Sequence, residues 1–75
     1  ALNERKEDIP LLVEKFLADI AEEQGTKIKM IDSKAMKELQ NQNWTGNIRE
    51  LRNVVERLVI MSSDTIDCED VKKYL

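Results

Sequence analysis

The chain has 75 residues, of which 41% are hydrophobic and 36% are charged, a balance typical of one small soluble domain. Its net charge of −3 does not suit a free-standing nucleic-acid-binding domain, which normally carries a basic surplus. It has no histidine and a single cysteine, Cys68, so histidine catalysis and an internal disulfide are excluded and a reducing compartment fits. No apolar run approaches the roughly 20 residues that cross a bilayer, so no membrane association is expected.

A charged segment, residues 1–7, leads into the first predicted helix. Asp8 suits an N-cap, and Pro10 is tolerated in the first turn that follows. Gly25 is expected to end this helix, because glycine readily adopts the left-handed conformation of a C-cap. Between them, apolar residues recur with helical spacing and predict a buried stripe. The stripe consists of Ile9, Leu12, Val13, Phe16, Leu17 and Ile20.

A connector, residues 26–31, separates the first helix from the second, and its alternation is too short to predict a strand. Asp32 or Ser33 is expected to cap the second helix, which runs to about Gln42. Trp44 follows a polar break, and we predict a structural role for it because a lone tryptophan is usually largely buried.

The third predicted helix runs from about Asn47 to Met61. Its apolar face consists of Ile48, Leu51, Val54, Val55, Leu58 and Val59, and this spacing favours Ile48 as a core residue. Asp67 then suits the N-cap of a short final helix that ends near Leu75. Four helices with short connections predict an all-α, four-helix bundle-like fold, with residues 1–75 as a single domain.

Arg49 is the best candidate for a chemical role. It lies in the first turn of the third helix, where the helix dipole makes a cation mildly unfavourable, by roughly 0.3–1 kcal/mol. The same end of a helix is well suited to a phosphate, and an arginine strengthens that preference. From spacing alone, a surface ion pair of Arg49 with Glu50 or Glu56 is the more common arrangement. Arg52 is expected to pair with Glu56 one turn later.

The residues around Arg49 form a recognisable pattern: Trp44-Thr45-Gly46-Asn47-Ile48-Arg49-Glu50-Leu51-Arg52-Asn53, followed by Glu56-Arg57. The pattern resembles the second-sensor region of the AAA+ ATPase module in sigma-54-dependent transcriptional activators, the bacterial enhancer-binding proteins. The family's usual Trp-Pro-Gly-Asn-(Val/Ile)-Arg-Glu-Leu-x-Asn is kept except that Thr45 replaces proline. The segment Leu2-x-Glu4-Arg5-x-Glu7-Asp8-Ile9-Pro10-Leu11-Leu12 resembles the start of the lid in the same family. The resemblance therefore covers nearly the whole chain.

The resemblance implies that the chain is the helical lid subdomain of a cytoplasmic AAA+ response regulator. In this family the residue that matches Arg49 reaches toward the γ-phosphate of ATP, which the neighbouring α/β core holds with Mg²⁺. Asn47 and Ile48 would lie near the nucleotide, and Ile9 would cover one side of the adenine. The sequence has no Gly-x-x-x-x-Gly-Lys-Ser/Thr loop, so the chain alone is expected neither to hydrolyse ATP nor to bind it tightly.

The resemblance also implies partners. The full protein would form a homo-oligomeric ring, usually a hexamer, and its ATP hydrolysis would remodel sigma-54 RNA polymerase, while another domain binds DNA. Two other functions stay open. A helical protein-interaction module would need an exposed apolar patch, whereas the apolar stripes of the predicted helices are expected to be buried in one core. A small DNA-binding domain would use Arg49, Arg52 and Arg57, but the interleaved acidic residues Glu50 and Glu56 oppose it.

Overall fold

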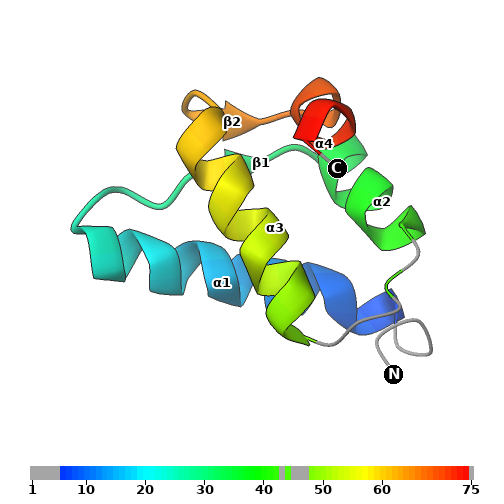
Figure 1. Ribbon diagram of the computed structural model, residues 1–75, viewed down its shortest axis with the longest axis horizontal. Coiled ribbons are helices and arrows are strands. Elements are labelled where there is room, and N and C mark those ends of the chain that lie inside the picture. The colour runs from blue at the N-terminus through cyan, green and yellow to red at the C-terminus, as the bar shows by residue number, and fades with distance from the viewer. Residues whose placement is uncertain (1–5, 43, 45–47, 75) are drawn as a thin grey trace.

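The computed structural model describes residues 6–42, 44 and 48–74, and it is mostly helical (Figure 1). Its elements in chain order are a 3₁₀ turn η2 (Lys6–Asp8), helix α1 (Ile9–Gln24), strand β1 (Met30–Ile31), helix α2 (Ser33–Asn41), helix α3 (Ile48–Met61), strand β2 (Thr65–Ile66) and helix α4 (Cys68–Tyr74). Over these residues the predicted all-α fold with four helices is confirmed.

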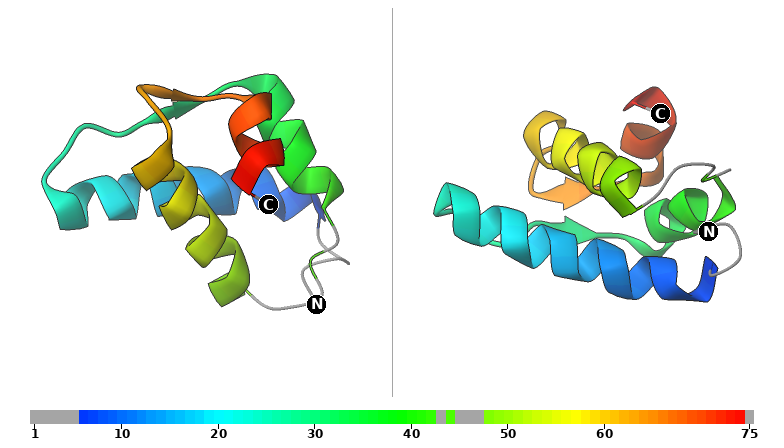
Figure 2. Two further views of the ribbon diagram at one scale, coloured as in Figure 1. Left: turned by 45° about the horizontal axis from the view of Figure 1, so that its top comes forward. Right: turned by 60° about the horizontal axis from the view of Figure 1, so that its bottom comes forward.

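The four helices pack as two crossing pairs. Helix α3 lies across α1, and α4 packs against both α2 and α3. Figure 1 shows α1 along the bottom of the molecule, α3 in front of it, and α2 with α4 at the right. The two further views in Figure 2 show the same arrangement and place η2 and the end of α4 on the same side of the molecule.

A short parallel bridge, which the sequence did not predict, ties two connections together. Strand β1 pairs with β2, with Met30 opposite Thr65 and Ile31 opposite Ile66. Strand β1 lies between α1 and α2, whereas β2 lies between α3 and α4. The bridge therefore links the α1–α2 connection to the α3–α4 connection.

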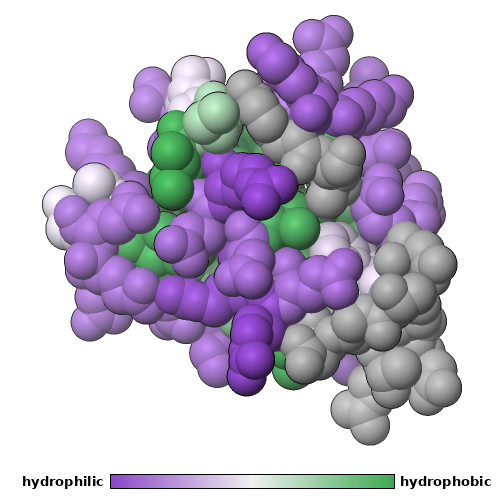
Figure 3. Space-filling model, viewed as in Figure 1, coloured by the Kyte–Doolittle hydropathy of each residue, from purple (hydrophilic) through white to green (hydrophobic). Residues whose placement is uncertain are grey.

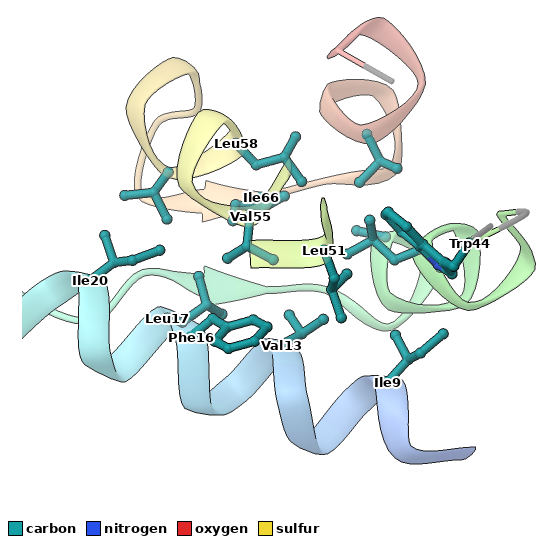
Figure 4. Close-up of a cluster of buried hydrophobic side chains, with 14 residues drawn as sticks. Ile9, Val13, Phe16, Leu17, Ile20, Trp44, Leu51, Val55, Leu58 and Ile66 are labelled. Carbon is teal, nitrogen blue, oxygen red and sulfur yellow. The ribbon is translucent and has the colours of Figure 1, made fainter. Parts of the chain in front are cut away.

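The hydrophobic core fills the space between α1, α3 and the bridge (Figure 4). Side chains of α1 point upward into it and meet those of α3 and β2. The labelled core residues are Ile9, Val13, Phe16, Leu17, Ile20, Trp44, Leu51, Val55, Leu58 and Ile66, and each is at most 7% exposed. The helical stripes predicted from sequence spacing thus supply one continuous core.

The predicted C-cap of α1 forms, whereas the predicted N-cap hydrogen bond does not. Gly25 ends the helix as expected, with a left-handed backbone (φ 66°, ψ 33°). Asp8 precedes the helix as expected, but its side chain makes no capping hydrogen bond to it. The reason is its backbone, which is already helical (φ −84°, ψ −15°) in the preceding 3₁₀ turn, whereas a capping residue usually has an extended conformation.

Two other predicted caps form. The side chain of Asp32 accepts a hydrogen bond of 2.7 Å from the backbone N–H of Ala35, so Asp32 and not Ser33 caps α2. At the start of α4, Asp67 accepts from the N–H of Asp70 at 2.8 Å, and the Asp70 carboxylate accepts from the N–H of Asp67 at 3.2 Å. This reciprocal pair satisfies two backbone donors at once, as in a capping box.

Candidate functional site

The first turn of α3 presents Ile48 and Arg49 at the surface. The Ile48 side chain is 51% exposed, and Arg49 is also exposed. Figure 1 and the left panel of Figure 2 show that this end of α3 extends beyond α1. A molecule or domain that approaches this end of the helix therefore meets an arginine and an apolar side chain together.

The exposure of Ile48 corrects the sequence-based interpretation of it as a core residue. Its spacing from Leu51 and Val55 places it on the apolar face of α3, and both of those residues are buried. Ile48 nevertheless lies one turn earlier, where the helix has passed the edge of α1 and the core has ended. Helical periodicity identifies the face of a residue, but not where along the helix the neighbouring elements stop.

The other predicted nucleotide-facing residues differ in position. Asn47 lies outside the described residues, so its expected place near the nucleotide stays a prediction. Ile9 has no exposed surface, which confirms its place in the core. The expected contact of Ile9 with the adenine stays a prediction.

Trp44 connects the start of the motif to α2 through a buried hydrogen bond. Its side chain is 2% exposed, and its indole N–H donates a 2.8 Å hydrogen bond to the carbonyl oxygen of Leu39. Leu39 lies in the last turn of α2, where carbonyl groups lack partners within the helix. The predicted structural role of Trp44 is thus confirmed, and Figure 4 shows the ring at the α2 end of the core.

Polar contacts join α3 to distant parts of the chain. Nη2 of Arg52 donates to both carboxylate oxygens of Glu23 in α1, each at 2.9 Å. This corrects the expected partner, Glu56, which is on the same helix as Arg52. At the other end of α3, the Lys29 ammonium donates to the carbonyl oxygens of Val59 and, at 2.7 Å, Ser62. No local sequence pattern indicates this contact, because Lys29 is 30 and 33 residues away from its partners.

Two features are absent from the part of the chain that the structure describes. No group of three or more Cys, Asp or Glu side chains there could hold a metal ion. None of the described helices is both long enough and apolar enough to cross a bilayer.

A model of the AAA+ ATPase lid domain family matches residues 3–75. The chain belongs to this family. The match includes the first turn of α3, and it agrees with the resemblance to the lid of sigma-54-dependent activators that the motif around Arg49 indicated.

Similar proteins carry the same lid within much longer chains. An NtrX-like response regulator of Rickettsia typhi is 45% identical over 76 residues, which cover 100% of the lid and 16% of the relative. The formate hydrogenlyase transcriptional activator FhlA of Escherichia coli is 43% identical over 65 residues, or 87% of the lid and 9% of the relative. The lid thus spans less than a fifth of these proteins.

A solved structure also resembles the lid closely. NtrX from Brucella abortus, crystallised in complex with ADP, superimposes with a TM-score of 0.82 at 44% sequence identity. The alignment covers 93% of the lid and 17% of that chain. At this identity the likeness extends to the sequence as well as the fold, so the helices of the lid have direct counterparts in NtrX.

The lid has a second exposed surface, at the C-terminal end of α3. We call it the apolar end and define it by Ile28, Met30, Ile60 and Met61, which are between 52% and 70% exposed. Ile28, Met30 and Ile60 line one hollow of about 680 Å³ between the α1–β1 connector and α3. Figure 3 shows apolar surface over the last turn of α3 among hydrophilic side chains. None of these four residues belongs to the helical stripes that were predicted to form the core, so the apolar end is an addition to that prediction.

Proposed function

We propose that this lid closes over ATP held by the α/β core of the same protein and presents Arg49 to the γ-phosphate. The exposed position of Arg49 in the first turn of α3, within a chain that belongs to the AAA+ lid family, is the observation that carries the proposal. A guanidinium is always charged and binds phosphate oxygens through paired N–H groups. The N-terminal end of a helix adds favourable potential for an anion.

Neighbouring residues would support Arg49. Ile48, at 51% exposed, would pack against the core domain or an apolar part of the nucleotide. Asn47 would lie beside the nucleotide at the start of the same helix. Ile9, which has no exposed surface in the lid, would act from inside the core by supporting the first turn of α1.

Most of the nucleotide contacts would belong to the core domain. The lid supplies one guanidinium to the phosphates, whereas the phosphate-binding loop and the ligands of Mg²⁺ would lie in the α/β core. We propose that the whole protein is an ATP-hydrolysing, homo-oligomeric ring, a hexamer, that remodels sigma-54 RNA polymerase in the cytoplasm. Relatives described as response regulators and a transcriptional activator support this proposal, as does a neighbour crystallised with ADP.

Replacing Arg49 tests the proposal. In the full-length protein, Arg49→Ala should lower the ATP turnover rate about tenfold or more, because a charged donor that meets the transferring phosphoryl group is lost. The free energy of unfolding of the lid should change by less than about 0.5 kcal/mol, since Arg49 is exposed. Arg57→Ala, which removes another exposed arginine from α3, is the matched control. Equal turnover in the Arg49 and Arg57 variants would refute the role.

We also propose that a neighbouring subunit of the ring packs against the apolar end. Four large apolar side chains exposed together favour a protein contact. The described chain begins at η2 and finishes in α4, both on the right in Figure 1, whereas the apolar end lies at the left. The apolar end therefore lies away from both ends of the described chain.

The DNA-binding alternative loses support from the structure. It requires a basic face on α3 built from Arg49, Arg52 and Arg57. Arg52 instead donates to the carboxylate of Glu23, so its charge is already neutralised.

A further inference from the structure

Two residues, one on each side of the turn that follows α1, contact α3 at two separate places. Glu23 lies in the last turn of α1, just before the connector, and Lys29 lies just before β1. Glu23 contacts Arg52 in the N-terminal half of α3, and Lys29 contacts the carbonyl groups of Val59 and Ser62 at the other end. One stretch of seven residues, 23–29, therefore contacts both halves of the helix.

The contact at Arg52 is close to Arg49. The two arginines are three residues apart on one helix, so their side chains lie on the same side of α3, about one turn apart. The side chains of Arg52 and Glu23 are 30% and 61% exposed, and an ion pair this exposed stabilises a fold only slightly. One nitrogen, Nη2 of Arg52, donates to both carboxylate oxygens of Glu23 at 2.9 Å, so the contact fixes where the two side chains meet.

Core packing alone leaves the first turn of α3 weakly held. The buried residues of the helix begin at Leu51, and the preceding turn extends past α1 with Ile48 and Arg49 exposed. The pair of Arg52 and Glu23 adds a long-range polar contact about one turn further along the helix. A contact there restricts how far the exposed turn can tilt or rotate.

We propose that Glu23 and Arg52 are positioning residues for Arg49. Their ion pair ties the exposed start of α3 to the last turn of α1, so that Arg49 is already directed when the lid closes. This inference rests on the proposed function of Arg49 and extends it, since neither Glu23 nor Arg52 is required to touch the nucleotide.

Charge reversal in the full-length protein tests the proposal. Arg52→Glu or Glu23→Arg alone should lower kcat for ATP about two- to fivefold, the range expected from the strength of one surface ion pair. The double reversal should restore kcat to within about twofold of the parent, because the pair forms again with opposite orientation. Arg57→Glu, a reversal elsewhere on α3, is the control and should leave kcat unchanged. A double variant as slow as the product of the two single effects would overturn the proposal.

Combination with Arg49→Ala separates positioning from a general structural role. If Arg52 acts through Arg49, Arg52→Glu should cause no further loss of kcat in the Arg49→Ala protein. Multiplying losses would instead show that Arg52 acts independently of Arg49 and would overturn the proposal. Should a reversed variant fail to fold by circular dichroism, Arg52→Gln and Glu23→Gln provide the same comparison without repulsion.

The same series distinguishes the two proposals. Full turnover in Arg49→Ala would refute the role of Arg49 and, with it, the positioning role. A loss in Arg49→Ala without recovery in the double reversal would refute only the positioning role of Glu23 and Arg52.

Discussion

Replacing Trp44 by phenylalanine removes one buried hydrogen bond and part of a buried ring. The indole N–H donates to the Leu39 carbonyl at 2.8 Å, and such a bond contributes about 0.5–1.5 kcal/mol. We expect about 1 kcal/mol or less from it, because the same carbonyl also accepts from the N–H of Gln42 at 3.3 Å. The smaller ring leaves unfilled space worth about 1 kcal/mol more, since Trp44 is only 2% exposed. The free energy of unfolding should therefore fall by about 2 kcal/mol.

The 75-residue chain should still fold with this loss. At about 0.05–0.15 kcal/mol per residue, its unfolding free energy is about 4–11 kcal/mol. Each kcal/mol corresponds to about 4–8 °C for a domain of this size, so Tm should fall by about 8–16 °C. Urea unfolding should be followed by far-UV circular dichroism, because the substitution removes the one tryptophan.

A surface substitution provides the comparison for Trp44→Phe. Ile60→Ala removes apolar atoms from a side chain that is 64% exposed and should change the unfolding free energy by less than about 0.5 kcal/mol. If Trp44→Phe is no less stable than Ile60→Ala, the indole does not fasten the motif to α2 and the reasoning fails.

Two further substitutions test contacts at the C-terminal end of α3. Lys29→Met keeps a long unbranched side chain but leaves the Val59 and Ser62 carbonyls without the ammonium group. The free energy of unfolding, measured in urea, should fall by about 1–3 kcal/mol. Lys27→Met, at an exposed position, is the control, and equal stability of the two variants would contradict the contact. Ile60→Glu should weaken ring assembly of the full-length protein in sedimentation velocity while the 75-residue chain keeps its Tm. Rings that assemble at the same concentration would exclude the apolar end as a subunit contact.

The parts of the fold that the sequence predicted depend on neighbours along the chain. Helical stripes, the C-cap at Gly25 and the caps at Asp32 and Asp67 all involve residues within a few positions of one another. Their physical causes, such as backbone freedom at glycine or a carboxylate near free N–H groups, are visible in a short stretch of sequence.

The parts that it missed depend on how helices cross. The partner of Arg52 is 29 residues away in α1, and the partners of Lys29 are 30 and 33 residues away in and just beyond α3. The β1–β2 bridge has two residues in each strand, too few for an alternating pattern to be recognised. Ile48 follows the same rule, because its exposure depends on where α3 passes the edge of α1.

These missed contacts bear directly on the candidate site. The motif identifies Arg49, but the direction in which Arg49 points depends on the position of α3, and α3 is held by residues outside the motif. The motif contains both Arg49 and Arg52, but Glu23, which binds Arg52, and Lys29, which binds the other end of α3, both lie outside it.

Helix α3 also connects the two proposed contact surfaces. It has 14 residues and is therefore about 20 Å long, with Arg49 at one end and the apolar end at the other. A tilt of only about 3° about one end moves the other end by about 1 Å, which is enough to break a hydrogen bond of ordinary length. A subunit that packs on Ile60 and Met61 would therefore change the distance between Arg49 and a phosphate unless α3 is restrained. In this proposal the contacts of residues 23–29 determine how strongly ring assembly affects the position of Arg49.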